Sequence, residues 1–211
     1  MSYSVKELFY TLQGEGAQTG RAAVFCRFSG CNLWSGLDKD RHKTVCSFCD
    51  TDFVGTDGEG GGKFSDARQL SQAIVNAWPD SSQGVPYVVF TGGEPLLQLN
   101  TLLIELLHKA GFEIGVETNG TINAPAGIDW LCVSPKQLDG LKQRSGQELK
   151  LLYPLPDVSP EQFDALDFRH FFLQAIDENN GENNQQKVVQ YCLEHPKWRV
   201  SLQTHKLLGL K

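Results

Sequence analysis

Short apolar runs alternate with amphipathic segments along this chain, a pattern that is typical of a parallel α/β architecture. Several runs are apolar throughout, which is expected of strands that are covered on both faces. The segments predicted as strands are residues 22–28, 87–91, 112–118, 130–134, 148–153, 170–175 and 199–204.

Three segments carry apolar residues at helical spacing. The first of them follows Ser65 and Asp66, either of which can cap a helix N-terminus. The segments predicted as helices are residues 65–78, 99–110 and 185–195. Their apolar stripes are expected to be core contacts without chemistry.

The predicted strands outnumber the predicted helices, and 211 residues are too few for a complete eightfold barrel of typically ~250 residues. The sequence therefore predicts a single domain over residues 1–211, built as an incomplete TIM-like barrel of about six parallel strands with few helices, or alternatively as a strongly twisted open sheet. The glycine-rich segment 55–64 follows no strand in the nucleotide-binding pattern, so we expect a mobile loop or lid there.

Composition is that of an ordinary globular protein, with 40% hydrophobic and 21% charged residues. The net charge of -6 provides no overall attraction for nucleic acid or an anionic membrane. No apolar run reaches the roughly 18 to 20 residues that span a bilayer, and the N-terminus lacks the pattern of a secretory signal. We expect a cytoplasmic protein.

Six cysteines are present, and in a reducing cytosol a cluster of them indicates metal binding more than disulfides. Cys46 and Cys49 are separated by two residues, and Cys31 precedes Cys46 by a polar stretch of 14 residues. The other cysteines, which have apolar neighbours and are expected to be small core residues, are Cys26, Cys132 and Cys192.

The cysteine trio allows two metal hypotheses. A structural zinc site needs four ligands, and His42 is available to complete it, although His42 lies in a hydrophilic run that is typical of a solvated loop. An iron–sulfur cluster normally takes four cysteines, so a cluster on three would keep one iron open for a small molecule. Gly92-Gly93-Glu94-Pro95, directly after a predicted strand, favours the second hypothesis because its glycines allow close approach of a ligand to the backbone.

These features resemble the radical S-adenosylmethionine (SAM) enzymes, in which three cysteines bind a [4Fe-4S] cluster and SAM occupies the fourth iron. Phe48 matches the aromatic residue that precedes the last cysteine of that motif. Ser35 stands where the second cysteine is usual, and Cys46 replaces it 11 residues later. The longer loop costs about 1.4 kcal/mol in closure entropy, whereas metal binding to thiolate sites contributes roughly 10 kcal/mol or more.

Motifs along the whole chain resemble the 7-carboxy-7-deazaguanine synthase family, including a subgroup with the same 14-residue gap. The matching stretches are residues 10–16, 27–34, 49–51, 91–95, 117–121, 134–136, 173–177 and 203–210. The resemblance implies a radical ring contraction of 6-carboxy-5,6,7,8-tetrahydropterin to 7-carboxy-7-deazaguanine and ammonia, on the route to queuosine and other 7-deazapurines. It also implies a homodimer, Mg²⁺, a reductant such as flavodoxin or ferredoxin, and SAM that is regenerated.

The resemblance also implies roles for individual residues, with no protein side chain as catalyst because the adenosyl radical performs the chemistry. The cluster ligands would be Cys31, Cys46 and Cys49, and the Mg²⁺ ligand Thr51. The SAM contacts would be Phe48, Cys49, Asp50, Gly93, Glu94, Ser134, Pro135, Lys136, Gln174, Ala175, Ile176 and Asp177. The pterin contacts would be Leu12, Gln13, Gly14, Glu15, Arg27, Thr91, His205 and Lys211.

Simpler roles exist for some of these residues, and two other functions compete. On the sequence alone Arg27 could be a surface charge, Thr51 a helix N-cap, and residues 14–16 an ordinary glycine turn. A glycyl-radical-enzyme activase would need a large protein partner and would consume SAM. A non-catalytic zinc module would be colourless, whereas an iron–sulfur protein is brown.

Overall fold

The computed structural model describes residues 1–79, 83–177 and 183–210 and has a mixed α/β fold. The chain divides into two compact units. The first consists of Met1–Thr11, Ala22–Thr118 and Asn123–Leu131, and the second of Leu12–Arg21, Asn119–Ile122 and Cys132–Lys211. In the described part of the chain, no helix is both long enough and apolar enough to cross a membrane.

The first unit contains a mixed sheet with the strand order β3-β1-β2-β4-β5. Its strands are β1 (Tyr3–Leu12, whose last residue belongs to the second unit), β2 (Ala22–Phe28), β3 (Gly62–Phe64), β4 (Tyr87–Gly92) and β5 (Glu113–Thr118). β2, β4 and β5 are parallel, with Val24 opposite Val88 and Val88 opposite Ile114, whereas β3 pairs antiparallel with β1. The parallel strands therefore end along one edge, where the cysteine segment and the Gly92–Pro95 segment begin.

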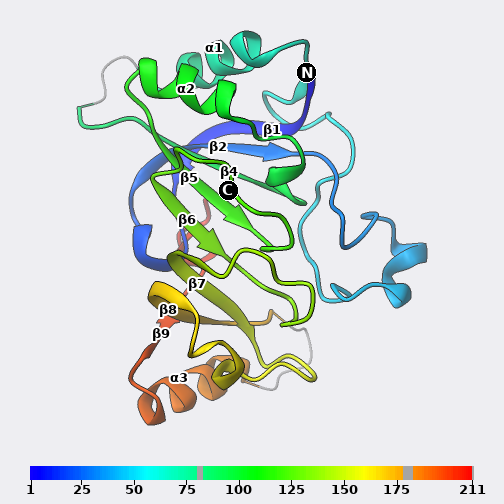
Figure 1. Cartoon of the computed structure of the whole chain (residues 1–211), viewed down its shortest axis with the longest axis vertical. Helices are drawn as coiled ribbons and strands as arrows, with labels where there is room; N and C mark the ends of the chain where they lie inside the picture. The colour runs from blue at the N-terminus through cyan, green and yellow to red at the C-terminus, as the bar shows by residue number, and fades with distance from the viewer. Residues whose placement is uncertain (80–82, 178–182, 211) are drawn as a thin grey trace. The chain divides into compact units, whose positions relative to one another are not determined.

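The helices of this unit are α1 (Ala67–Ala77), α2 (Thr101–Lys109) and the 3-10 helices η2 (Asp38–Lys43) and η3 (Pro95–Leu97). The Asp66 side chain caps α1 by accepting from the backbone N–H of Gln69, and Asn100 caps α2 in the same way through Leu103. α2 therefore starts two residues later than predicted. Figure 1 shows α1 and α2 packed side by side.

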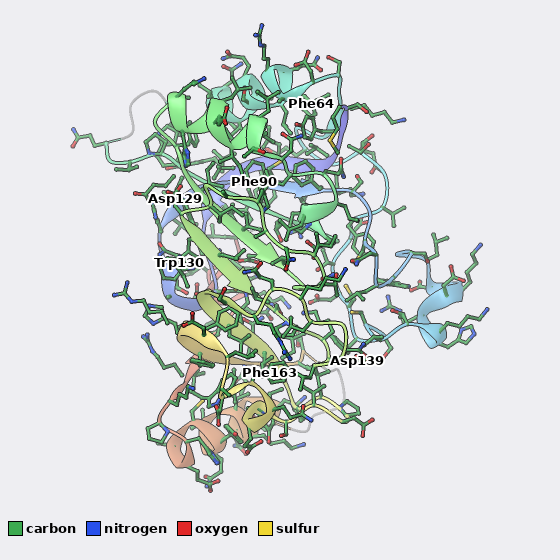
Figure 2. The ribbon with its side chains drawn as sticks, in the orientation of Figure 1. Phe64, Phe90, Asp129, Trp130, Asp139 and Phe163 are labelled. Atoms are coloured by element: carbon green, nitrogen blue, oxygen red, sulfur yellow. The ribbon has the colours of Figure 1, made fainter. Side chains whose placement is uncertain are left out.

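Aromatic side chains fill the core of the first unit. The rings of Phe28 and Phe90 stack with centroids 5.6 Å apart, and Tyr3 stacks on Phe28. Figure 2 shows Phe90 among the strands of this unit. This packing fixes the end of β2 at Phe28. Only Ser29 and Gly30 separate that strand end from Cys31.

The glycine-rich segment 55–64 is not the lid that the sequence predicts, because it runs along β1. The backbone N–H of Gly58 donates to the carbonyl of Lys6 at 2.9 Å, and Leu8 donates to Glu59 at 2.7 Å. A Cβ on Gly61 would lie 2.2 Å from the Lys6 carbonyl oxygen. The glycines thus serve a close approach of two backbones rather than a hinge.

The second unit is built on parallel strands in the order β6-β7-β8-β9. The strands are β6 (Trp130–Val133, shared between the units), β7 (Ser145–Tyr153), β8 (Asp167–Ala175) and β9 (Trp198–Ser201). The helices are α3 (Asn184–Glu194), α4 (Thr204–Leu208), and the 3-10 helices η1 (Gly16–Gln18) and η4 (Pro160–Phe163). The Trp198 ring packs edge-on against Phe171 in its core, and Phe163 is fully buried.

All seven predicted strands and all three predicted helices are present, with unchanged bounds for residues 22–28 and shifted ends for the others. The prediction over residues 199–204 covers parts of two elements, because β9 ends at Ser201 and α4 begins at Thr204. Of the cysteines expected in the core, Cys26 and Cys132 are buried, whereas Cys192 is half-buried on α3.

Candidate active site

The cysteine segment leaves the end of β2 in the first unit, and Figure 1 shows it extending away from that strand. Cys46 is 5% exposed, and Cys31 and Cys49 are half-buried. The backbone N–H of Cys49 donates to the carbonyl of Cys46 at 3.1 Å, which closes the Cys-x-x-Cys turn. The last pair of thiols is thus carried on one hydrogen-bonded turn.

The 14 residues between Cys31 and Cys46 form an ordered excursion that contains η2. Thr44 fastens its end, because its hydroxyl donates to the Leu33 carbonyl at 2.6 Å and accepts from the N–H of Cys46 at 3.1 Å. Ser35, at the usual position of the second cysteine, donates instead to Asp40 at 2.8 Å. His42 is exposed on η2, as its hydrophilic surroundings predict.

The Gly92–Pro95 segment lies directly against Cys31. A Cβ on Gly93 would come within 2.7 Å of the Cys31 Cβ, so only glycine fits here. The N–H of Glu94 donates to the Gly30 carbonyl at 3.0 Å. Its buried carboxylate accepts from the Thr118 hydroxyl at 2.8 Å and from the N–H of Leu96 at 2.9 Å. The predicted SAM residues Gly93 and Glu94 therefore adjoin a predicted cluster ligand.

Burial raises the pKa of the Cys31 thiol, and the nearby Glu94 and Cys49 raise it further. Backbone N–H groups of Leu33 and Trp34 act in the opposite direction by donating to the sulfur. Ligation to a metal requires the thiolate, so metal binding at Cys31 would release a proton.

The donor chemistry fits an iron–sulfur cluster on three thiolates, because Cys31 and the Cys46–Cys49 turn supply three sulfur donors. Within residues 1–79, 83–177 and 183–210, no group of three or more His, Cys, Asp or Glu side chains is arranged to hold a metal ion. The assembly of Cys31, Cys46 and Cys49 into one ligand set therefore stays a prediction.

Arg27 and Thr91 are neighbours in this unit, because the β2–β4 register pairs them directly. Thr91 is buried. Arg27 is not an isolated surface charge, since its Nε donates to Oε1 of Glu7 at 2.7 Å and both side chains are 21% exposed. The sequence pattern gives no signal for Glu7, because its partner Arg27 lies on another strand.

The segment after Cys49 is tied to β1 by Lys6. The Lys6 ammonium group pairs with Asp52 at 2.9 Å and Asp57 at 2.8 Å and donates to the Val54 carbonyl at 2.9 Å. Thr51, the predicted Mg²⁺ ligand, is half-buried within this segment and precedes no helix, so it is not a helix N-cap. Phe48 is half-buried and Asp50 exposed.

A polar network in the second unit centres on Glu15. Its carboxylate pairs with the ammonium group of Lys150 and accepts from the side-chain amides of Gln174 at 3.0 Å and Gln203 at 2.9 Å. Ser201 donates to Gln174 at 2.9 Å. Residues from three other parts of the chain thus enclose one carboxylate.

The Lys150–Glu15 pair keeps the carboxylate charged. Burial raises the pKa of Glu15, but the Lys150 charge and the three hydrogen bonds outweigh burial and lower the pKa to about 2. Lys150 is itself buried and was not singled out from the sequence. Its position within the apolar strand ELKLLY is the sequence feature that could have identified it, because a lysine buried in such a strand needs a partner of opposite charge.

The remaining predicted pterin contacts of this unit lie beside Glu15. Gln13 and Gly14 are buried, and the Thr204 N–H donates to the Gly14 carbonyl at 2.9 Å. The His205 ring packs on Gly14, because a Cβ there would lie 2.1 Å from its Nδ1. Leu12 ends β1, and Lys211 lies outside the described residues.

The other predicted SAM contacts occupy strand ends of the second unit. Residues 134–136 follow β6, where the Lys136 ammonium donates to the Ser134 hydroxyl at 2.7 Å. Residues 174–177 end β8 and continue beyond it. The Ile176 carbonyl accepts from Asn184 at 3.1 Å, and Asp177 pairs with Lys206 at 2.9 Å. Strand ends are where ligands bind in parallel α/β folds.

Comparisons with known proteins agree with the family that these motifs predict. A 7-carboxy-7-deazaguanine synthase from Caulobacter vibrioides is 61% identical over 213 residues, and one from Bordetella pertussis is 58% identical over 210 residues, each covering 100% of both chains. The crystal structure of QueE from Escherichia coli has a TM-score of 0.70 at 26% identity and covers 96% of this chain and 94% of its own. No protein-family model matches. On the strength of the full-length relatives, this chain belongs to the 7-carboxy-7-deazaguanine synthase family.

Proposed function

We propose that this protein is a radical SAM lyase that converts 6-carboxy-5,6,7,8-tetrahydropterin to 7-carboxy-7-deazaguanine and ammonia. The observation that carries the proposal is the 61% identity, over the full length of both chains, to a protein named for that product. The cysteine trio, the Gly92–Pro95 segment and the Glu15 network all lie within the matched length.

The first unit would hold the redox centre on its cysteine segment. Cys31, Cys46 and Cys49 would ligate a [4Fe-4S] cluster, which when bound supplies the electron that cleaves SAM to methionine and a 5'-deoxyadenosyl radical. The Gly93 backbone packs directly against Gly30 and Cys31, and this position beside a proposed cluster ligand supports its role as a contact for the methionine part of SAM. No protein side chain is proposed as the hydrogen-abstracting group.

The polar residues suit recognition of a carboxylated pterin. Arg27 carries a planar fork that can bind a carboxylate through two parallel hydrogen bonds, and Glu7 fixes its Nε edge. Glu15 stays ionised beside Lys150 and can accept hydrogen bonds from the amino and ring N–H groups of a pterin. The remaining proposed contacts to the pterin are Leu12, Gln13, Gly14, Thr91, His205 and Lys211.

SAM and magnesium would be bound by backbone and side chains at strand ends. The proposed SAM contacts are Phe48, Cys49, Asp50, Gly93, Glu94, residues 134–136 and residues 174–177. Thr51 would offer a hydroxyl oxygen to Mg²⁺, which binds few protein oxygens and fills its shell with water or substrate.

The family resemblance also supports the coarser features of the assembly. We propose that residues 1–211 act as a single radical SAM domain with an incomplete barrel of about six parallel strands. We further propose a cytoplasmic homodimer that receives its electron from a reductant such as flavodoxin or ferredoxin. Sedimentation of the iron-loaded protein tests this proposal, because a homodimer has a mass of twice 23.4 kDa.

Product analysis tests the function directly. Anaerobically reconstituted protein with the carboxypterin, SAM and dithionite is expected to release 7-carboxy-7-deazaguanine and ammonia in equal amounts, while SAM stays constant. A glycyl-radical activase would instead consume SAM and leave the pterin intact. Failure of an iron- and sulfide-loaded sample to form the deazapurine would refute the proposal.

A further inference from the structure

Arg41, in the excursion between the first two cysteines, links three elements of the cysteine segment. Its Nη1 donates to the carbonyl oxygens of Ser47 and Cys49, both at 2.9 Å. Nε and Nη2 donate to Oδ1 of Asp38 at 3.2 and 3.0 Å. The guanidinium carbon lies 4.2 Å from the centre of the Trp34 ring. One side chain thus joins η2, the Trp34 ring and the Cys46–Cys49 turn.

The ring on which Arg41 rests is itself fixed. Trp34 is 7% exposed, its Nε1 donates to the Leu37 carbonyl at 3.3 Å, and its ring packs edge-on against Phe53 at 5.6 Å between centroids. Phe53 is fully buried. The guanidinium therefore connects the turn to a buried pair of packed aromatic rings.

Arg41 binds the carbonyl groups of Ser47 and Cys49. The first lies in the peptide plane that precedes Phe48, and the second lies in the plane that follows the last cysteine. Restraining both planes fixes the direction in which the Cys46–Cys49 turn presents its side chains. We propose that Arg41 is a positioning residue that holds this turn in its ligand-ready conformation before iron binds. This inference rests on the proposed function only for the identity of the bound group.

The contact set explains why an arginine is needed. Two acceptors on the turn, one on Asp38 and a flat ring require a planar group with several N–H donors in fixed directions. A lysine would keep the charge, but its ammonium group lacks the planar arrangement of donors that can bond to both carbonyls while the group stacks flat on Trp34. The Asp38 carboxylate is 90% exposed, so its pairing with Arg41 is expected to matter least.

Hydrogen–deuterium exchange of the metal-free full chain tests the inference without any cofactor. Peptides that cover residues 44–50 contain the bonded amides of Cys46 and Cys49. Arg41→Ala is expected to speed their exchange roughly tenfold, Arg41→Lys to do so nearly as much, and Asp38→Ala only slightly. Lys39→Ala is the matched control, because it removes an exposed charge from the same 3-10 helix and should leave exchange unchanged.

A second readout follows iron and sulfide uptake during anaerobic reconstitution. Slower uptake in Arg41→Ala than in Lys39→Ala, with exchange in β4 unchanged in both, would support positioning. Wild-type exchange in Arg41→Ala, or full protection in Arg41→Lys, would overturn the inference. If the wild-type chain took up no cluster, the proposed function would fail on that count, whereas the exchange data would still decide the role of Arg41.

Discussion

The Nε atom of Arg27 donates a 2.7 Å hydrogen bond to Oε1 of Glu7, from one strand of the first unit to the next. Both side chains are about four-fifths buried, so the pair is shielded from solvent screening more than a surface ion pair. Because Glu7 engages the Nε edge, it fixes the plane of the guanidinium group. The pair gives a sharp test of carboxylate recognition by this protein.

Replacing Arg27 by Lys is expected to raise the KM for the carboxypterin roughly tenfold to a hundredfold. This range corresponds to the loss of one charge-assisted hydrogen bond, which contributes about 1.5–3 kcal/mol of binding free energy. The dissociation constant for SAM should stay within about twofold, since Arg27 is assigned only to the pterin carboxylate. Glu7→Gln, which keeps an acceptor without the charge, should have a smaller effect on the same KM. Steady-state kinetics and equilibrium dialysis measure both quantities, and equal losses for pterin and SAM would contradict the assignment.

Each of Cys31→Ala, Cys46→Ala and Cys49→Ala is expected to abolish stable cluster assembly and turnover, because a cluster left with two protein thiolates is poorly held. Iron and sulfide content after anaerobic reconstitution is the measurement. Cys192→Ser is the matched control, since Cys192 lies on α3 outside the predicted ligand set and should load as the wild type does. Full loading of any of the three alanine variants would show that the ligand set is wrong.

Lys150→Met is expected to destabilise the fold at pH 7 by about 3–5 kcal/mol, because it leaves the Glu15 carboxylate buried without its cation. The pKa of Glu15 in the folded chain is lowered to about 2, so the pair stabilises above the unfolded pKa of about 4.3 and loses its effect as pH falls from there toward 2. The variant without Lys150 can protonate Glu15 at a higher pH.

The deficit in unfolding free energy should therefore be smaller at pH 4 than at pH 7, as urea denaturation at the two pH values would show. The double variant Glu15→Gln with Lys150→Met should recover much of the stability that the single change removes. An identical deficit at both pH values would mean that packing of the lysine stem, and not its charge, determines the effect.

Gly93→Ala is expected to destabilise the first unit by about 1–3 kcal/mol, because the added methyl group would meet the Gly30 carbonyl and Cys31. Ala175→Gly, a change of one methyl group elsewhere among the proposed SAM contacts, serves for comparison. Thermal unfolding of the metal-free chains measures stability, and calorimetry of the loaded chains measures SAM affinity. Unchanged values of both in Gly93→Ala would contradict the close approach.

Apolar runs and helical stripes were enough to predict the parallel strands and the three longest helices, since burial determines those elements locally. β1 escaped prediction because Lys6 and Glu7 interrupt its apolar pattern. Both charges are satisfied by partners far along the chain, Asp52 and Asp57 for Lys6 and Arg27 for Glu7. Such pairing is visible only in three dimensions.

The cysteines and the Gly92–Pro95 segment could be identified from the sequence because their spacing and residue types are local signals. The residues that support them could not. Lys150 reaches Glu15 across 135 positions of sequence, and Arg41 stacks on Trp34 in a stretch whose composition predicts only a solvated loop. Supporting contacts of this kind depend on tertiary geometry, so sequence patterns carry little information about them.

Paramagnetic resonance of the reduced, iron-loaded protein tests most directly whether one iron of a three-thiolate cluster binds SAM. Addition of SAM labelled with ¹⁵N at its methionine amino group should change the cluster signal and introduce a hyperfine coupling to that nitrogen. An unchanged signal without coupling, in a sample that equilibrium dialysis shows to have bound SAM, would contradict the account.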